Sequence, residues 1–276
     1  MNNIKVGDFV ARKSHKKDLV FKVIRKIKLS NKKEIAILRG ITVRVEADAP
    51  IEDLCLIESK EIKKIIKTLD NNILEKIKKD KIILDKQNKR KKELINTGKI
   101  LHLDGDKKYS DKAIRYYKKM GLNAVVKNIS ESKQPQVIYN LLNYYNPDIL
   151  VITGHDGMIK KETRFNDIYN YRNSKYFIET VKQARKYEKD YKKNIAIFAG
   201  ACQSYYEALI LAGANFASSP ARILIDFLDP LIVAKNIAMT DKEKYVTIDD
   251  IVEELRDGKK GVNGIGVNGK KTIIII

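Results

Sequence analysis

Two apolar stretches of the sequence decide the fold, and each ends in a reactive side chain. Residues 149–157 read ILVITGHDG, and residues 195–204 read IAIFAGACQS. In both, an apolar run of strand length leads into a glycine, which is typical of a buried parallel strand and the turn after it. His155 follows the first glycine, and Cys202 comes just after the second. Because sites in open parallel sheets form at the carboxyl ends of strands, neighbouring strands would bring these two side chains together.

Strand and helix signals alternate around these two stretches. We expect strands at residues 99–103, 123–129 and 272–276, helices at 108–120, 134–145, 174–186 and 204–211, and a glycine-rich loop or hairpin at 259–269. Such alternation predicts a mainly parallel sheet with helices on both faces. We therefore expect an α/β fold over residues 97–276.

The N-terminal part has a different character. Short segments rich in Val, Ile and Phe lie between turn signals, at residues 6–12, 19–27, 34–39, 42–46 and 54–57. They predict a small SH3-like β-barrel over residues 1–58. In residues 59–96, Ile and Leu recur at helical spacing among many lysines. This segment predicts a basic helical linker, either one long helix or two helices that break near residues 70–72.

Composition limits the class of protein. Of 276 residues 43% are hydrophobic, and Lys and Arg number 55 against 35 Asp and Glu. A core can therefore form, and the net charge of +20 indicates either contact with polyanions or a surface of solvated lysines. Two cysteines cannot build a disulfide framework. With no apolar run long enough to span a membrane and no apolar signal-peptide core, we expect a cytoplasmic protein.

Cys202 and His155 together fit nucleophilic catalysis. Cys202 stands at a predicted strand-to-helix turn, where the positive end of a helix beginning near Ser204 would favour the thiolate. His155 would act as acid and base, and the backbone N–H groups of Asp156 and Cys202 would stabilise an oxyanion. Taken singly, the cysteine could be an inert buried thiol and the histidine a core or capping residue. Their shared place at glycine-flanked strand ends favours catalysis.

The order of the histidines excludes other sites. The sequence has His15, His102 and His155, and none follows Cys202. Class I glutamine amidotransferases carry their histidine after the cysteine, so that arrangement is excluded. The histidines and cysteines lack the spacing of zinc ligands, and no phosphate-binding loop is present. We expect neither a metal nor an organic cofactor, and we interpret Cys55 as an inert core thiol.

The residues around the cysteine resemble the caspase, legumain and clostripain group. The caspase signature Q-A-C-[RQG]-G is matched at residues 201–203, and a histidine lies at a comparable distance upstream. Residues 200 and 204 differ from the signature, and Asp156 stands where the group has a glycine after its histidine. The resemblance implies a caspase-like sheet with the reacting pair on adjacent strand ends.

Longer segments resemble the YabG family of sporulation-specific peptidases. They are residues 7–14 (GDFVARKS), 101–106 (LHLDGD), 147–156, 198–203 and 212–220. This resemblance implies a cysteine endopeptidase that processes spore coat and related spore proteins. It also implies cleavage after Arg and self-cleavage, for which the many Lys and Arg of residues 59–95 would offer sites.

Cleavage after a basic residue requires a carboxylate in the substrate pocket. In the caspase-like arrangement the loop after the first strand contributes to this pocket, and here that loop contains Asp104 and then Asp106. Both aspartates could instead stabilise the turn itself. Asp226 and Asp229 compete for the same role.

Two further segments have expected roles near the site. Residues 217–219, with Ser218 and Ser219, would pair with the substrate backbone as an added strand. His102 would pack within its strand or support the site.

A non-enzymatic interpretation stays open on the residues alone. The positive charge and the N-terminal strands would also suit a basic module that binds nucleic acid or a protein assembly. Salt-dependent binding that does not change in a Cys202→Ala variant would distinguish this module from a peptidase.

Overall fold

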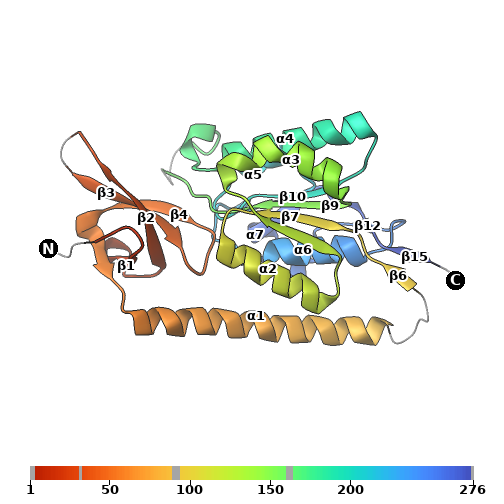
Figure 1. Cartoon of the computed structure of the whole chain (residues 1–276), viewed down its shortest axis with the longest axis horizontal. Coiled ribbons are helices and arrows are strands. Elements are labelled where there is room, and N and C mark those ends of the chain that lie inside the picture. Colours follow the sequence, from red (N-terminus) through yellow and green to blue (C-terminus); the bar gives the residue numbers. More distant parts are fainter. Residues whose placement is uncertain (1–3, 31–32, 89–93, 160–163, 275–276) are drawn as a thin grey trace.

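Two main sheets and one long helix organise the structure, a computed structural model that describes residues 4–30, 33–88, 94–159 and 164–274. In Figure 1 the N-terminal sheet lies at one end, and the larger sheet with its helices fills the rest. Helix α1, Ser59–Asn88, runs beneath both. It is one helix without a break at residues 70–72, and residues 89–93 of the predicted linker lie outside the described residues.

The N-terminal sheet is antiparallel and has five strands in the order β4-β3-β2-β1-β5. The strands are β1 Phe9–Arg12, β2 Val20–Lys28, β3 Glu34–Gly40, β4 Glu46–Pro50 and β5 Leu54–Leu56. The strand predicted at residues 42–46 is wrong, because β4 begins only at Glu46. Residues 41–45 leave the sheet and pass to the larger part, where Val45 bridges Asp156. An SH3-like closure of this sheet stays a prediction.

The larger sheet has six strands in the order β13-β11-β10-β9-β7-β8. They are β7 Ile100–Asp104, β8 Ala124–Asn128, β9 Ile149–Thr153, β10 Ala196–Ala199, β11 Phe216–Ser218 and β13 Val262–Gly264. Only β13 is antiparallel to its neighbour. The predicted mainly parallel sheet is therefore confirmed, and its two reactive strand ends are neighbours, since Phe198 on β10 pairs with Val151 on β9.

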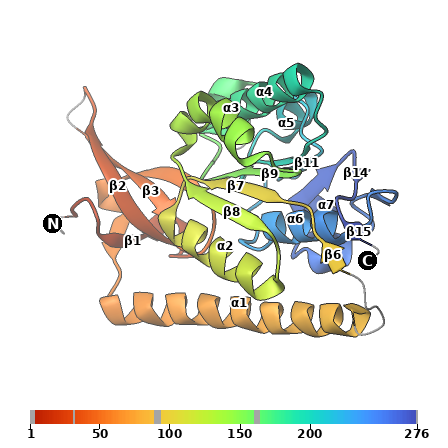
Figure 2. The same ribbon diagram turned by 45° about the vertical axis from the view of Figure 1, so that its right-hand side comes forward.

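Helices cover both faces of this sheet, as predicted (Figure 2). One face carries α3 Gln134–Tyr145, α4 Ser174–Tyr191 and α5 Tyr206–Leu211, and the other carries α2 Lys107–Met120, α6 Asp229–Met239 and α1. Alternate strand residues serve the two sides, because Val151 packs with α2 and α6 while Ile152 packs with α3 and α4. This two-sided burial explains why the strands read as continuous apolar runs.

The C-terminal part contains elements that the sequence analysis did not assign. Helix α6 is buried on nearly all sides, so it lacks the amphipathic period that identifies surface helices. The glycine-rich residues 259–269 form α7 Gly258–Gly261, β13 and β14 Val267–Asn268, which pairs with β12 Tyr245–Val246. The last strand, β15 Thr272–Ile274, pairs with β6 Leu94–Asn96. Residues 275–276 of that predicted strand lie outside the described residues.

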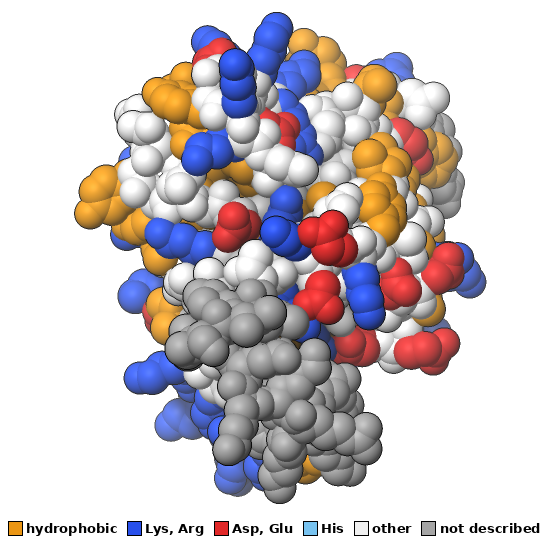
Figure 3. Space-filling model, turned by 90° about the vertical axis from the view of Figure 1, so that its right-hand side faces the viewer, with side chains coloured by type: hydrophobic (Ala, Val, Ile, Leu, Met, Phe, Trp, Pro, Cys, Tyr) orange, Lys and Arg blue, Asp and Glu red, His pale blue; other side chains and the backbone are white. Residues whose placement is uncertain are grey.

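Charge on the end of the molecule away from the N-terminal sheet is mixed. Figure 3 shows Lys and Arg side chains interspersed with Asp and Glu on this face, so no single basic patch dominates it. Within the described residues, no helix is both long enough and apolar enough to cross a membrane.

Phe198 anchors the core between β10 and α6, and it is fully buried. We expect Phe198→Ala to lower the free energy of unfolding by about 3–5 kcal/mol, since it removes a large apolar side chain and leaves a cavity. Tyr144→Ala, at a side chain that is 79% exposed, is the control and should change little. Urea unfolding monitored by circular dichroism measures both. A similar loss in the two variants would contradict this account of the core.

Candidate active site

The ends of β9 and β10 bring His155 and Cys202 to the same edge of the sheet. Both residues are fully buried. The hydroxyl of Thr153, the last residue of β9, donates to the carbonyl of Gly200 just after β10, at 2.9 Å. The two strand ends are thus tied together before the reactive residues leave them.

The Asp156 carboxylate fixes the backbone on both sides of this edge. It accepts hydrogen bonds from the hydroxyls of Ser204, at 2.8 Å, and Ser174, and from the N–H groups of Gly157 and Asn173. Burial raises the pKa of Asp156 to about 6, and these four donors oppose the rise. The Asp156 carboxylate is fully used by these four hydrogen bonds. The group of Asp156 that remains for the site is its backbone N–H.

Residues 41–45 of the N-terminal part cover the site, and Arg44 lies at its centre. The Arg44 carbonyl accepts from the N–H of Asp156 at 3.2 Å and from the N–H of Cys202 at 3.3 Å. These are the two donors that the sequence analysis named for an oxyanion. Two residues after Arg44, the N–H of Glu46 donates to the Asp156 carbonyl at 2.7 Å. The covering segment therefore lies in backbone contact with both strand ends.

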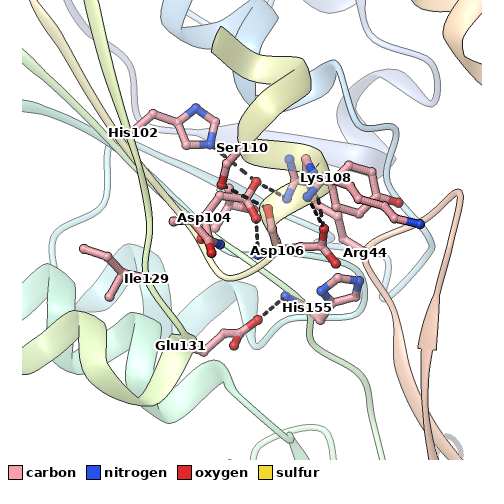
Figure 4. Close-up of polar contacts among 12 residues, drawn as sticks. Arg44, His102, Asp104, Asp106, Lys108, Ser110, Ile129, Glu131 and His155 are labelled. Carbon is pink, nitrogen blue, oxygen red and sulfur yellow. Dashed lines mark hydrogen bonds and ion pairs between the residues drawn. The ribbon is translucent and has the colours of Figure 1, made fainter. Parts of the chain in front are cut away.

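The Arg44 side chain fills a closed pocket of opposite charge (Figure 4). Its Nη1 lies 2.6 Å from Oδ2 of Asp104, and both side chains are fully buried. The guanidinium carbon lies 4.5 Å from the ring centre of Tyr109 and 5.3 Å from that of Phe227, so two aromatic faces complete the pocket. Nε and Nη2 of Arg44 have no hydrogen-bond partner among the described residues.

The two candidate aspartates of this loop have different tasks. Burial alone would raise the pKa of Asp104, but the Arg44 guanidinium and His102 outweigh it and hold the pKa well below its usual range. Asp106 instead caps α2, because its carboxylate accepts from the N–H groups of Lys108 and Tyr109. Asp104 is the carboxylate that meets a basic side chain.

His102 lies beside Asp104. Its Nε2 lies 3.8 Å from the Asp104 carboxylate, and its Nδ1 is 3.0 Å from the hydroxyl of Tyr117. Burial lowers the pKa of His102, so it stands neutral beside the ion pair. As a neutral ring without a hydrogen bond to the carboxylate among the described residues, the imidazole does not compete with Arg44 for Asp104.

The Cys202 thiol is protonated in this state. Burial raises its pKa to about 12, although the Ile225 N–H, 3.3 Å from Sγ, and Arg44 act to lower it. The helix dipole expected to favour the thiolate is weak here, because α5 begins only at Tyr206 and has six residues. The thiol also packs in the core of the N-terminal sheet, with Phe21 and Leu54.

His155 lies across from the same segment. Its Nε2 is 3.4 Å from the Gly40 carbonyl, which requires the proton on Nε2 and leaves Nδ1 as a free lone pair. Nδ1 is buried and, among the described residues, has no partner, and no hydrogen bond joins the imidazole to the thiol there. Burial lowers the pKa of His155, so the ring is a neutral base.

Glu131 positions His155 through its backbone. The carboxylate, 2% exposed, accepts from the His155 N–H at 2.8 Å and pairs with Arg39 of β3 at 3.3 Å. It lies against Gly105 and Gly154, where any Cβ would sit within 3 Å of it. Sequence reasoning missed Glu131, because its place before α3 shows no motif.

Four other candidate residues lie apart from the Arg44 pocket. Ser218 and Ser219 are buried, and their hydroxyls donate to the carbonyls of Ala201 and Ile223. Strand β11 already pairs with β10 and β13, so the predicted pairing of residues 217–219 with a substrate has no free strand edge. The carboxylate of Asp226 pairs with the Arg256 guanidinium at 3.8 Å and accepts from the Leu228 N–H. The carboxylate of Asp229 accepts from the backbone N–H groups of Asp226 and Arg256.

Arg44 itself was not singled out by the sequence. Its neighbours Val43 and Val45 gave the segment the look of a sheet strand. The signal that could have found it is an Arg in an extended, β-branched run, because an endopeptidase binds its substrate as an extended chain.

Known proteins of one family are similar to this chain. The model of the YabG peptidase U57 family matches residues 5–275. The sporulation-specific protease YabG of Bacillus subtilis (strain 168) is 39% identical over 96% of this chain and 95% of its own. The receiver domain of the histidine kinase CKI1 from Arabidopsis thaliana aligns with 42% of this chain and 79% of its own, at 18% identity and a TM-score of 0.30, which is too low to carry an argument. The chain is therefore a peptidase, and it belongs to the YabG peptidase U57 family.

Proposed function

We propose that this protein is a cysteine endopeptidase that cleaves after Arg, with Cys202 as nucleophile and His155 as acid and base. The observation that carries the proposal is the position of Arg44, whose carbonyl oxygen receives the N–H groups of Asp156 and Cys202 while its guanidinium pairs with Asp104. A scissile carbonyl needs two such donors, and a substrate Arg needs such a carboxylate. One residue satisfies both requirements at once.

In the first step the Cys202 thiol transfers its proton to His155 while its sulfur forms a bond to the substrate. The sulfur attacks the carbonyl carbon of the Arg, and the oxygen gains negative charge, which the two N–H groups stabilise. The C–N bond then breaks, and the amine leaves with the proton from His155. Water hydrolyses the thioester, which frees the carboxylate and returns the thiol. Because the pKa of Cys202 is about 12 here, proton transfer and attack must be coupled.

The first substrate in this proposal is the chain itself, at the bond between Arg44 and Val45. The segment that carries this bond bends at residues 41–44 and already lies in backbone contact with both strand ends. Residues 59–88 form α1, whose peptide bonds are held in the helix and which contains no Arg. Arg90, the one Arg of residues 59–95, lies outside the described residues. While residues 41–45 stay in place they exclude other proteins from Cys202, so cleavage of other substrates requires their departure.

The substrates outside the chain are proposed to be spore coat and related spore proteins. The support is the resemblance to the YabG family and the Bacillus subtilis relative, which is named as sporulation-specific. Membership of a peptidase family argues against the non-enzymatic interpretation. Contact with nucleic acid stays a prediction, which the net charge of +20 and the N-terminal strands motivated.

Self-cleavage should produce a fragment whose first residue is Val45. We expect intact-mass spectrometry of purified protein to find this fragment, and Cys202→Ala and Arg44→Gln to abolish it, because the first removes the nucleophile and the second the charge that pairs with Asp104. Arg25→Gln, at an exposed Arg of β2, is the matched control and should cleave as the unchanged chain does. A Cys202→Ala chain that still yields the fragment would rule out Cys202 as the nucleophile.

Asp104 and Asp106 should respond differently to the same substitution. We expect Asp104→Asn to slow self-cleavage about 100-fold, since a buried charge loses its partner. Asp106→Asn should change the rate little, because Asn also caps helices well. Rates are read from a time course of the two fragments. Equal slowing by the two variants would mean that the pocket does not depend on Asp104.

The cover over Cys202 can be measured by alkylation. With a pKa of about 12, only about one Cys202 thiol in ten thousand is ionised at pH 8. In a His155→Ala chain, which should stay whole, we expect iodoacetamide to label Cys202 slowly, and at least about ten times faster when Arg44→Gly is added. The gain in access to the thiol should outweigh the loss of the guanidinium that lowers its pKa. Cys55 in the same digests is the internal control. Unchanged labelling of Cys202 would show that residues 41–45 do not cover the thiol.

A further inference from the structure

The chain that follows Arg44 runs along residues 156–157 of the larger part of the molecule and makes backbone contacts with them. Val45 forms a parallel bridge with Asp156, and the Glu46 N–H donates to the Asp156 carbonyl. The Glu46 carbonyl then comes so close to Gly157 that a Cβ there would lie 2.1 Å from the oxygen. Only glycine at position 157 admits a backbone at this place. An extended chain leaving the scissile bond is therefore led along residues 156–157.

Arg172 lies where this path reaches Asp48. Its guanidinium pairs with the carboxylate of Asp48, the fourth residue after Arg44. The Arg172 side chain is only 13% exposed, whereas that of Asp48 is 40% exposed. Nε of Arg172 is buried and has no hydrogen-bond partner in the described ranges. Arg172 is thus the more buried partner of the pair, and Asp48 is the more exposed partner on the chain that follows Arg44.

The wall around Arg172 is held by contacts that do not involve residues 41–48. The Arg172 N–H donates to the Gly157 carbonyl at 3.1 Å, which joins it to the path itself. Next to it, the ring of Tyr171 stacks on Tyr205 at 4.9 Å, and the Tyr171 hydroxyl accepts from Arg222 at 2.8 Å. Arg172 would therefore keep its place after residues 41–48 have left.

We propose that Arg172 forms a binding subsite for an acidic residue four positions after the cleaved bond. The inference rests on the proposed function, because it takes the bond after Arg44 as the one that is cut. An extended substrate advances about 3.3 Å per residue, so a chain of another protein on the same path would bring its fourth residue to Arg172. A half-buried guanidinium that loses Asp48 favours a substrate that supplies a new carboxylate.

Peptides of residues 40–50 test the subsite, because they contain a single Arg. The full chain, after self-cleavage is complete, is given this peptide with Asp, Asn or Lys at the position of Asp48. We expect kcat/KM to fall in that order, by about tenfold between Asp and Lys at low salt, and the difference to shrink as salt is added. Arg172→Glu should reverse the order, so that the Lys peptide is cut faster than the Asp peptide.

Lys175→Glu is the matched control, since it reverses an exposed charge nearby on α4 and should leave the order unchanged. If the order of the three peptides stays the same in Arg172→Glu, the ion pair only holds the N-terminal part in place and the subsite is refuted. That outcome differs from failure of the proposed function, in which none of the peptides is cut after Arg. In the second case both proposals fall.

Self-cleavage provides an independent measurement in the intact chain. Asp48→Lys should slow the appearance of the Val45 fragment, and Asp48→Lys combined with Arg172→Glu should restore it to within a few-fold, because the pair is re-formed with opposite charges. Additive slowing in the double variant would overturn the pairing on which the subsite depends.

Discussion

The buried ion pair between Arg44 and Asp104 is the interaction on which the rest of the structure depends. Two charges without water are costly to bury, and they are tolerated only with good geometry and further partners. Here Tyr109, Phe227 and His102 supply those partners. To reach Asp104, the chain must leave the N-terminal sheet after β3 and rejoin it at β4. The pair therefore determines both the shape of one sheet and the cover over the carboxyl ends of the other.

The same cover sets two opposing conditions at Cys202. Burial keeps the thiol protonated, with a pKa of about 12, which protects it from oxidation and from chance reaction. It also brings the Arg44 carbonyl against the N–H groups of Asp156 and Cys202. The closed state thus combines a poorly reactive nucleophile with a well-placed carbonyl, which suits a reaction that is slow and happens once.

The strand ends could be predicted from sequence, and the residues that meet them could not. His155 and Cys202 lie where apolar runs end in glycine, and this local pattern survives folding because parallel strands align their ends. Arg44 and Glu131 come from segments distant in sequence, and only tertiary packing brings them in. Thr42, Val43 and Val45 have strong strand propensity, yet residues 41–44 bend away from the sheet to reach Asp104 and the strand ends. Asp104 was a candidate from its loop, but choosing it over Asp106 required the cap of α2.

The strand order β4-β3-β2-β1-β5 has a consequence for what a cut after Arg44 would release. Strands β1, β2 and β3 precede the bond, whereas β4 and β5, which flank them on either side, follow it. After the cut, two polypeptides would form one sheet. The shorter one would contribute β1, β2 and β3, which lie between β4 and β5 of the longer one. Its escape would then be a dissociation, dependent on dilution and on competitors for the vacated strand edges. The order of the strands would therefore set the delay between cleavage after Arg44 and exposure of Cys202.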